Sequence, residues 1–202
     1  MRIIAGKYRS RRLAAPAGVE TRPTSDRLRE TLFNVLGVSV EGSVWLDLFA
    51  GSGAVGIEAL SRGASLVCFV ESSPRAARAV RSNLVALGIH HSCEVMEREV
   101  NSALRLLEQR FPACDFCFLD PPYRKREDYE RVLTFLSSSS LVKAGGLVIA
   151  EHDKHFDPGE AFAALRRYRK LRQGDAILSF YRRIATTEGT EEHGEESGRP
   201  RF

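Results

Sequence analysis

Long apolar stretches, cysteine and tryptophan are all scarce in this sequence of 202 residues. No uncharged run exceeds about a dozen residues, whereas a membrane-spanning helix needs roughly twenty apolar residues, so a transmembrane protein is excluded. Four cysteines are too few for a disulfide scaffold. The first residues include Arg2 and Lys7 and no apolar signal region. We therefore expect a cytoplasmic protein with reduced thiols.

The two ends of the chain are each poor in charge of one sign. Residues 1–29 contain eight Lys or Arg and only two acidic residues, whereas residues 186–202 contain five Glu and two Arg. The basic end favours a polyanionic partner, because each neutralised phosphate releases a counterion, although a solvated basic face is the alternative. The acidic end has too few apolar residues to order itself. We expect a disordered tail there.

Apolar and polar segments alternate along the rest of the chain in a regular way. Hydrophobic residues make up 43% of the sequence, which is enough for the core of one domain. Helical spacing and stop signals predict helices over 24–37, 54–62, 74–87, 100–107 and 129–136. Compact apolar runs predict strands over 44–49, 66–71, 93–96, 115–119 and 147–151, and 166–172 with 175–183 predict a final hairpin.

This order predicts an α/β fold, because repeated strand–helix units of this length need parallel pairing with helices on both faces. We expect a doubly wound, mostly parallel, Rossmann-like sheet of seven strands whose last strand is antiparallel. A short basic hairpin and helix precede it. The expected divisions are a basic extension (1–37) packed on the core, one catalytic domain (38–185) and the acidic tail (186–202).

A glycine-rich loop, Gly51-Ser52-Gly53-Ala54-Val55-Gly56, lies between a predicted strand and a predicted helix. Such glycines permit a tight turn and the close approach of a ligand to N–H groups at the helix start. Glu71 ends the next predicted strand, where a carboxylate can accept both hydroxyls of an adenosine ribose. Together they predict a nucleoside-bearing cofactor, and both nicotinamide dinucleotides and S-adenosylmethionine use this crevice.

A second motif, Asp120-Pro121-Pro122-Tyr123, follows the apolar run 116–119 and distinguishes between these cofactors. Asp120 is expected at the carboxyl end of a strand, where α/β ligands bind. The two prolines make a rigid turn, and the Tyr123 ring offers a face for stacking an extruded base. This combination suits methyl transfer to an exocyclic amine, whereas hydride transfer does not need it. An ordinary turn at the end of a strand is the alternative.

The motifs Leu46-Asp47-Leu48-Phe49-Ala50-Gly51-Ser52-Gly53 and Asp120-Pro121-Pro122-Tyr123 resemble those of class I S-adenosylmethionine-dependent amino-methyltransferases. More narrowly, Arg2-Ile3-Ile4-Ala5-Gly6 and the segment from Arg22-Pro23-Thr24 to Asn34 resemble the RsmD family. The resemblance covers nearly the whole chain except the tail. It implies methylation of a guanine N2 amine in 16S ribosomal RNA, as naked RNA or in an assembling small subunit, by a monomer.

The resemblance also assigns roles to individual residues. Asp47 and the loop Phe49, Ala50, Gly51, Ser52 and Gly53 would hold the methionine end of the cofactor, and Glu71 the ribose. Glu99 and Val100 occupy the place of the adenine contact, although related enzymes have a shorter side chain at Glu99. Asp120, Pro121, Pro122 and Tyr123 would form the catalytic turn. The RNA phosphates would be bound by the basic residues Arg2, Lys7, Arg9, Arg11, Arg12, Arg22, Arg27, Arg124, Lys125 and Arg126.

Three other functions are considered. An NAD-dependent oxidoreductase would use the glycine-rich loop and Glu71, and a non-catalytic RNA-binding assembly factor would use the basic segment, but both leave Asp120 without a role. A DNA N6-adenine methyltransferase is the nearest enzymatic rival, but it normally carries a separate target-recognition region. Cys114 and Cys117 have zinc or redox spacing without a second cysteine pair, so we expect buried thiols and no metal.

Another basic cluster lies near the end of the chain, at Arg166, Arg167, Arg169, Lys170 and Arg172. It coincides with a predicted edge strand. Positive charge on an edge discourages aggregation with other sheets, and the same charge could contact RNA. The sequence leaves both interpretations open.

Overall fold

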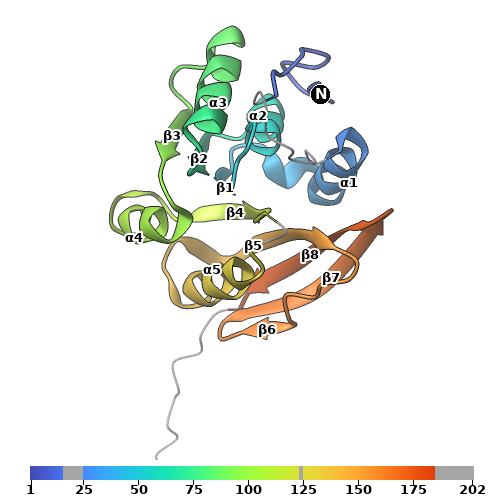
Figure 1. The fold of residues 1–202 in the computed structure, drawn as a ribbon, viewed down its shortest axis with the longest axis vertical. Coiled ribbons are helices and arrows are strands. Elements are labelled where there is room, and N and C mark those ends of the chain that lie inside the picture. The colour runs from blue at the N-terminus through green and yellow to red at the C-terminus, as the bar shows by residue number, and fades with distance from the viewer. Residues whose placement is uncertain (16–24, 123–124, 185–202) are drawn as a thin grey trace, which may run out of the picture.

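The structure, a computed structural model, describes residues 1–15, 25–122 and 125–184. They form a single sheet with helices on both faces (Figure 1). The helices are α1 (Asp26–Leu36), the short 3-10 helix η1 (Gly37–Val40), α2 (Ala54–Ser61), α3 (Pro74–Ala86), α4 (Val100–Arg110) and α5 (Glu127–Ser138). The strands are β1 (Val44–Leu48), β2 (Leu66–Glu71), β3 (Cys93–Glu97), β4 (Cys114–Leu119), β5 (Val142–Asp153), β6 (Ala161–Phe162), β7 (Leu165–Gln173) and β8 (Ala176–Arg183).

The sheet has the order β3-β2-β1-β4-β5-β8-β7-β6. Strands β3, β2, β1, β4 and β5 pair in parallel, and β8 pairs antiparallel with β5, which confirms the predicted Rossmann-like fold. The predicted count of seven strands is wrong, because the described residues form eight. The additional strand, β6, pairs Ala161 and Phe162 with the start of β7. Two residues are too few to show the alternating pattern by which a strand is recognised.

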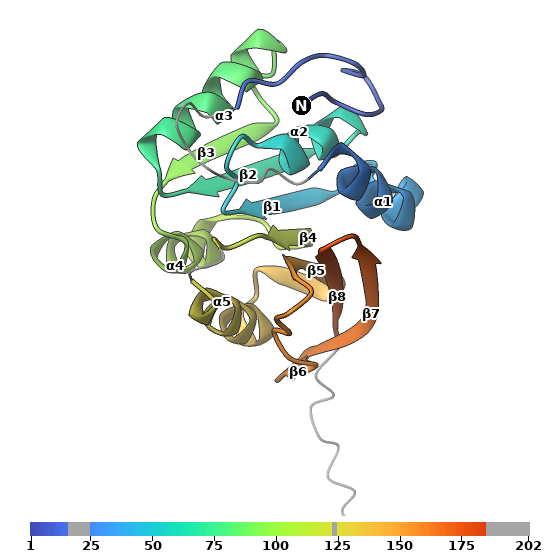
Figure 2. The same ribbon diagram turned by 45° about the vertical axis from the view of Figure 1, so that its right-hand side comes forward.

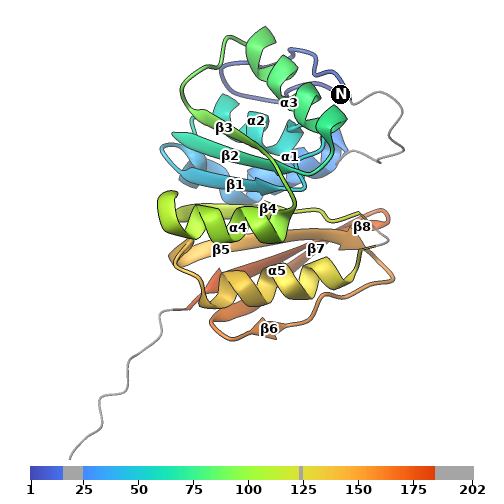
Figure 3. The same ribbon diagram turned by 60° about the vertical axis from the view of Figure 1, so that its left-hand side comes forward.

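The two faces of the sheet carry separate apolar cores, as expected for strands covered on both sides. Trp45, Phe69 and Phe118 pack on the side of α1, α2 and α3. Leu46, Cys117 and their neighbours pack on the side of α4 and α5, which Figure 3 shows lying on one face. The thiols of Cys114 and Cys117 are free and fully buried, as predicted.

The basic N-terminal segment folds against the first of these two faces, beside α2 and α3 (Figure 2). Arg2 and Arg12 form an isolated antiparallel bridge, and the side chains of Ile3 and Leu13 are buried in the core of that face. The buried carboxylate of Glu58 in α2 accepts the N–H groups of Ile4 and Ala5 at 2.8 and 3.0 Å. The hairpin is therefore held to the sheet by buried polar contacts as well as by apolar ones.

The expected division of the chain is not tested by the structure. The boundaries after residues 37 and 185 remain predictions, and the acidic tail (186–202), which is expected to be disordered, lies outside the described residues. Among the described helices, no helix has the length and apolar character that crossing a bilayer requires.

Candidate active site

Three predicted site segments meet where the strand order reverses, between β1 and β4. β1 pairs with both β2 and β4 in parallel, so the carboxyl ends of these strands share one edge of the sheet. That edge bears Glu71, the loop after β1 and Asp120 after β4. Ligands of open α/β sheets bind at such a switch point.

The loop after β1 has an unusual backbone. Phe49, Gly51 and Gly53 all have positive φ, at 60°, 57° and 76°, and such values are uncommon for a residue with a bulky side chain such as Phe49. A Cβ on Gly51 would meet no atom closer than 4.0 Å, so the loop is open there. A Cβ on Gly56 would meet Phe69 at 2.3 Å. The first glycine thus permits the turn, whereas the last lets α2 pack on β2.

Glu71 fixes this loop to the next helix. One of its carboxylate oxygens accepts the N–H of Gly51 at 2.8 Å, and the other accepts the N–H of Ser73 at 2.8 Å. Ser73 is the N-cap of α3, with Pro74 at the first turn. The half-exposed carboxylate lies at the position predicted to bind a ribose.

Asp47 is buried, whereas the loop that follows it is open at Gly51. Oδ2 of Asp47 accepts the N–H of Gly56 at 2.9 Å inside the first turn of α2. Burial raises its pKa to about 7, the hydrogen bond from Gly56 opposes that rise, and the negative charge of Glu71 adds to it. A role at the methionine end of a cofactor remains a prediction for Asp47.

Asp47 makes the stability of the protein depend on pH. The native carboxyl keeps a proton between about pH 4 and pH 7 that the unfolded chain has released, so this group lowers the free energy of unfolding as pH rises through that window. Asp47→Asn removes the titration and keeps an oxygen for Gly56. We expect the free energy of unfolding of the variant to equal that of the wild type near pH 4 and to exceed it by about 4 kcal/mol at pH 8.

Urea denaturation at several pH values measures this difference. A constant difference between the two proteins from pH 4 to pH 8 would contradict the assignment of the titration to Asp47.

Asp120 follows the buried end of β4 and is partly covered. Burial raises its pKa well above the usual range for an aspartate, and the negative charges of Glu151 and Asp47 raise it further. Glu151, buried near the end of β5, was not among the predicted site residues. Its position at the end of the apolar strand 147–150, beside the strand of Asp120, is the signal that could have found it.

The turn after Asp120 is only partly described, because Tyr123 and Arg124 lie outside the described residues. Pro121 is buried and Pro122 is exposed. The carbonyl oxygen of Pro122 accepts the N–H of Lys125 at 2.7 Å, which closes the turn.

Glu99 and Val100 lie at the start of α4. Val100 is buried in the core on the side of α4 and α5, whereas the Glu99 side chain is 63% exposed and its carboxylate lies 3.9 Å from Nζ of Lys125. This ion pair links the predicted adenine position to the turn that follows Asp120. Contact of either residue with a cofactor stays a prediction.

The predicted RNA-binding residues are divided between several places. Arg126 lies 3.5 Å from Asp153 and stacks over the Phe156 ring. Arg11 donates to the carbonyl of Ala86 at 3.1 Å. Lys7 lies over the ring of its neighbour, Arg12 is exposed, and Arg22 lies outside the described residues.

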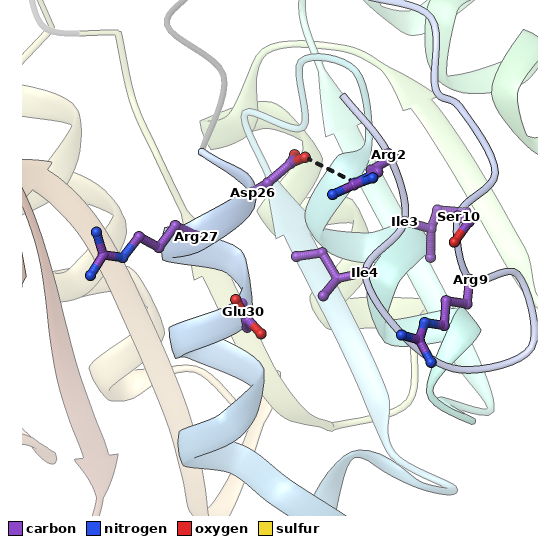
Figure 4. Close-up of a pocket in the computed structure, with 8 residues that line it drawn as sticks. All are labelled: Arg2, Ile3, Ile4, Arg9, Ser10, Asp26, Arg27 and Glu30. Carbon is purple, nitrogen blue, oxygen red and sulfur yellow. Dashed lines mark ion pairs between the residues drawn. The ribbon is translucent and has the colours of Figure 1, made fainter.

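Arg2, Arg9 and Arg27 are brought together around one cavity of about 550 Å³ between the N-terminal hairpin and α1 (Figure 4). Its other lining residues include Asp26, whose carboxylate lies 4.0 Å from Nε of Arg2, and Glu30. The cavity is therefore lined by charges of both signs.

The N-terminal segment also reaches the glycine-rich loop itself. Asn83 of α3, which is buried, donates from its amide nitrogen to the carbonyls of Ser52 and Ala14 at 3.0 and 3.1 Å and accepts the N–H of Ala14 at 2.8 Å. One side chain thus joins the basic segment to the predicted cofactor loop. Asn83 carried no signal in the sequence, because its role depends on segments far from it along the chain.

Within the described ranges, no group of three or more His, Cys, Asp or Glu side chains is arranged to hold a metal ion. The glycine-rich loop, with its open Gly51 position, and the half-exposed Glu71 fit a nucleoside-bearing group at the switch point. Asp120, with its raised pKa, fits a group that exchanges a proton there.

The chain is similar in sequence to one protein family over almost its whole length and to ribosomal RNA methyltransferases. The sequence model of a family described as conserved hypothetical protein 95 matches residues 1–182. Ribosomal RNA small subunit methyltransferase D of Haemophilus influenzae is 39% identical over 158 residues, which cover 76% of this chain and 79% of that protein.

Solved structures share the fold. A candidate methyltransferase from Escherichia coli superposes with a TM-score of 0.79 at 29% identity, over 91% of this chain and 98% of that one. An RNA methyltransferase from Salinibacter ruber, in complex with S-adenosyl-L-homocysteine, superposes with a TM-score of 0.60 at 16% identity, over 80% of this chain and 94% of that one. At this identity, the second similarity concerns the fold alone.

Proposed function

Because this chain belongs to the RsmD family, described as conserved hypothetical protein 95, we propose that it methylates the N2 amine of a guanine in 16S ribosomal RNA. It is an S-adenosylmethionine-dependent ribosomal RNA methyltransferase. The guanine N2 position, the use of naked RNA or of an assembling small subunit, and the monomeric state are the finer parts of the proposal.

The observation that carries the proposal is the position of Asp120. It follows the strand next to β1, at the same edge of the sheet as the glycine-rich loop and Glu71. A nucleoside held by that loop and a base held by the turn after Asp120 would meet at the switch point. Glu71 would bind the ribose hydroxyls, and the loop 49–53 the methionine end.

The reaction needs a methyl donor, a positioned amine and a proton acceptor. S-adenosylmethionine, when bound, would supply an electrophilic methyl group on a cationic sulfur, with neutral S-adenosylhomocysteine as the leaving group when the carbon–sulfur bond breaks. The guanine amine is a poor nucleophile because its lone pair is delocalised, so its orientation contributes most of the rate. Asp120 would accept a hydrogen bond from this amine and align its nitrogen with the methyl carbon.

Asp120 would also take the proton that the amine loses as its new bond to carbon forms. The carboxylates of Glu151 and Asp47 raise its proton affinity, which suits a proton acceptor. Asp120 would take this proton in its ionised form.

The rival functions explain less of the site. An oxidoreductase leaves the rigid turn Asp120-Pro121-Pro122-Tyr123 without a role, and a non-catalytic RNA-binding protein has no use for the glycine-rich loop. A DNA N6-adenine methyltransferase would use both features, but it does not account for the similarity to ribosomal RNA methyltransferases over most of the chain.

Transfer of labelled methyl groups from S-adenosylmethionine separates these functions. The substrates are small ribosomal subunits lacking the modification, free 16S RNA and duplex DNA, and the products are identified by nucleoside analysis. We expect N2-methylguanosine from RNA or subunits only. Label in the adenine of DNA would support methyl transfer to an amine but refute RNA as the substrate. Absence of label in every substrate, despite cofactor binding, would refute the methyltransferase activity.

A further inference from the structure

The basic residues of β7 point to two different faces of the sheet. Arg167 and Lys170 are opposite Tyr181 and Ser179 of β8 in the register, and Tyr181 packs in the core on the side of α4 and α5. Both basic side chains pair with Asp157: Nζ of Lys170 lies 2.9 Å from its carboxylate, and Arg167 is also 3.2 Å from Glu160. The charges of Arg167 and Lys170 are therefore neutralised, whereas Arg172, two positions after Lys170 on the same face, donates to the carbonyl of Gly174.

The opposite face carries a second basic group. Arg166 is opposite Arg182 in the register, and Arg169 is opposite Phe180, which packs in the core on the side of α1. Tyr168, at the irregularity between Arg167 and Arg169, has its ring 6.3 Å from that of Phe180. We call these exposed residues the basic face: Arg166, Tyr168, Arg169 and Arg182.

The basic face lacks the acidic partners that its opposite face has. In the described ranges, none of its three arginines forms an ion pair with a carboxylate, and Arg166 donates only to the carbonyls of Ala163 and Leu165. The guanidinium of Arg182 stacks over the Tyr168 ring at 4.7 Å, and Tyr168 remains 47% exposed. The result is an exposed aromatic ring among three positive charges.

Protection of the sheet edge does not account for this arrangement. It would explain positive charge on β7, which β6 covers at only two residues. It does not explain Arg182, because β8 is paired on both sides, with β5 and with β7. The arginines on the two strands share a face rather than an edge.

We propose that the basic face binds RNA, as a contact separate from the catalytic edge. Guanidinium groups bind phosphates through paired N–H donors, and an exposed tyrosine ring can stack on an unpaired base. The inference rests on the proposed function, which supplies an RNA substrate. The N-terminal hairpin and α1 lie on the same side of the sheet as the basic face, so one RNA could follow that side.

The register gives the scale of such a contact. Ala176 pairs with Asp153 at the carboxyl end of β5, and Arg182 pairs with Leu147, six residues earlier. Arg169 is level with Ile149, four residues earlier. At about 3.3 Å per residue, the basic face therefore extends from roughly 13 to roughly 20 Å along the sheet from that end. A molecule that reaches both places must be extended, which fits folded RNA and excludes a free nucleotide.

The test compares two triple variants of the full chain that lose the same charge. Arg166→Gln/Arg169→Gln/Arg182→Gln removes the basic face. The matched control, Arg105→Gln/Arg110→Gln/Arg131→Gln, removes three exposed arginines from α4 and α5 on the opposite side. Binding of 16S RNA and of small subunits is measured over a range of salt concentrations, together with S-adenosylmethionine binding.

We expect the basic-face variant to lose roughly tenfold or more in RNA affinity and to reduce the slope of log affinity against log salt by about 2. Its affinity for S-adenosylmethionine should stay within about twofold of the wild type, as should all affinities of the control. Tyr168→Ala should weaken RNA binding roughly fivefold, and Tyr168→Phe should not.

Several results would overturn the proposal. Equal RNA affinity of the two triple variants would remove the role of this face. Weaker binding of subunits with unchanged binding of naked RNA would assign the face to a ribosomal protein. A third variant replaces the five Glu residues of the tail with Gln. If this variant bound RNA more tightly while the basic-face variant bound RNA like the wild type, RNA affinity would be controlled by the acidic tail and not by the basic face. Failure of the wild type to methylate RNA that it binds would refute only the proposed function.

Discussion

Asp120→Asn is expected to lower the rate of methyl transfer by roughly 10² to 10⁴ while leaving the affinity for S-adenosylmethionine within about threefold of the wild type. The amide keeps the size of the carboxylate, but it cannot take the proton that the amine releases. It also loses the charge that orients the amine. Cofactor binding is conserved because the glycine-rich loop and Glu71 do not depend on Asp120.

The same strand offers a control for this variant. Asp115, near the other end of β4, accepts the N–H of Val44 at 2.9 Å and pairs with Lys143. Asp115→Asn should keep the activity within about twofold. Single-turnover transfer to RNA and a cofactor titration measure both variants, and an Asp120→Asn enzyme with more than a tenth of the wild-type rate would exclude Asp120 as the proton acceptor.

Glu58→Ala is expected to cost about 3–5 kcal/mol of unfolding free energy and to release the N-terminal hairpin. Glu58 is fully buried and lies 3.7 Å from Nε of Arg29, which is also fully buried. It accepts Nε of Arg62 at 2.8 Å in addition to the N–H groups of Ile4 and Ala5. The substitution therefore removes one of the two carboxylates near the buried Arg29 guanidinium, which keeps Asp26 at 3.0 Å, and leaves the part-buried N–H groups of Ile4 and Ala5 without their acceptor.

Two measurements separate the local effect from the global one. Denaturant unfolding gives the loss of stability, and amide exchange of residues 3–13 reports the release of the hairpin. Glu30→Gln, an exposed change on α1, should alter neither. If Glu58→Ala destabilised the protein while exchange in residues 3–13 stayed slow relative to the global rate, Glu58 would not be what holds the hairpin, and its apolar contacts and its bonds to Ser61 and Asn83 would suffice.

The elements of this fold could be predicted because their signals are local. Pro74 at the first turn and Gly88 after the last marked α3, and the actual helix is Pro74–Ala86. The glycine-rich loop and Asp120 were recognisable because each directly follows an apolar strand. β6 escaped prediction because a strand of two residues has no periodicity, and the prediction of seven strands was wrong for that reason.

The polar contacts across the fold could not be predicted, because they join residues far apart in sequence. Nothing in the sequence marks Arg29 and Glu58 as buried, yet both are fully buried and lie 3.7 Å apart. Similarly, the arginines of β7 read as one cluster. Only the register, with its irregularity between Arg167 and Arg169, separates Arg167 and Lys170, which pair with Asp157, from Arg166 and Arg169 on the basic face.

The long-range anchoring of the hairpin has a consequence for folding during synthesis. The hairpin's polar partners, Glu58, Ser61 and Asn83, follow it by 53 to 69 residues. Likewise, β1 can pair with β4 at the centre of the sheet only after about 70 further residues have been synthesised. Contacts at such separations form slowly, because loop closure precedes the stabilising contact. The basic segment is therefore made before its partners and docks only after much of the domain has followed it.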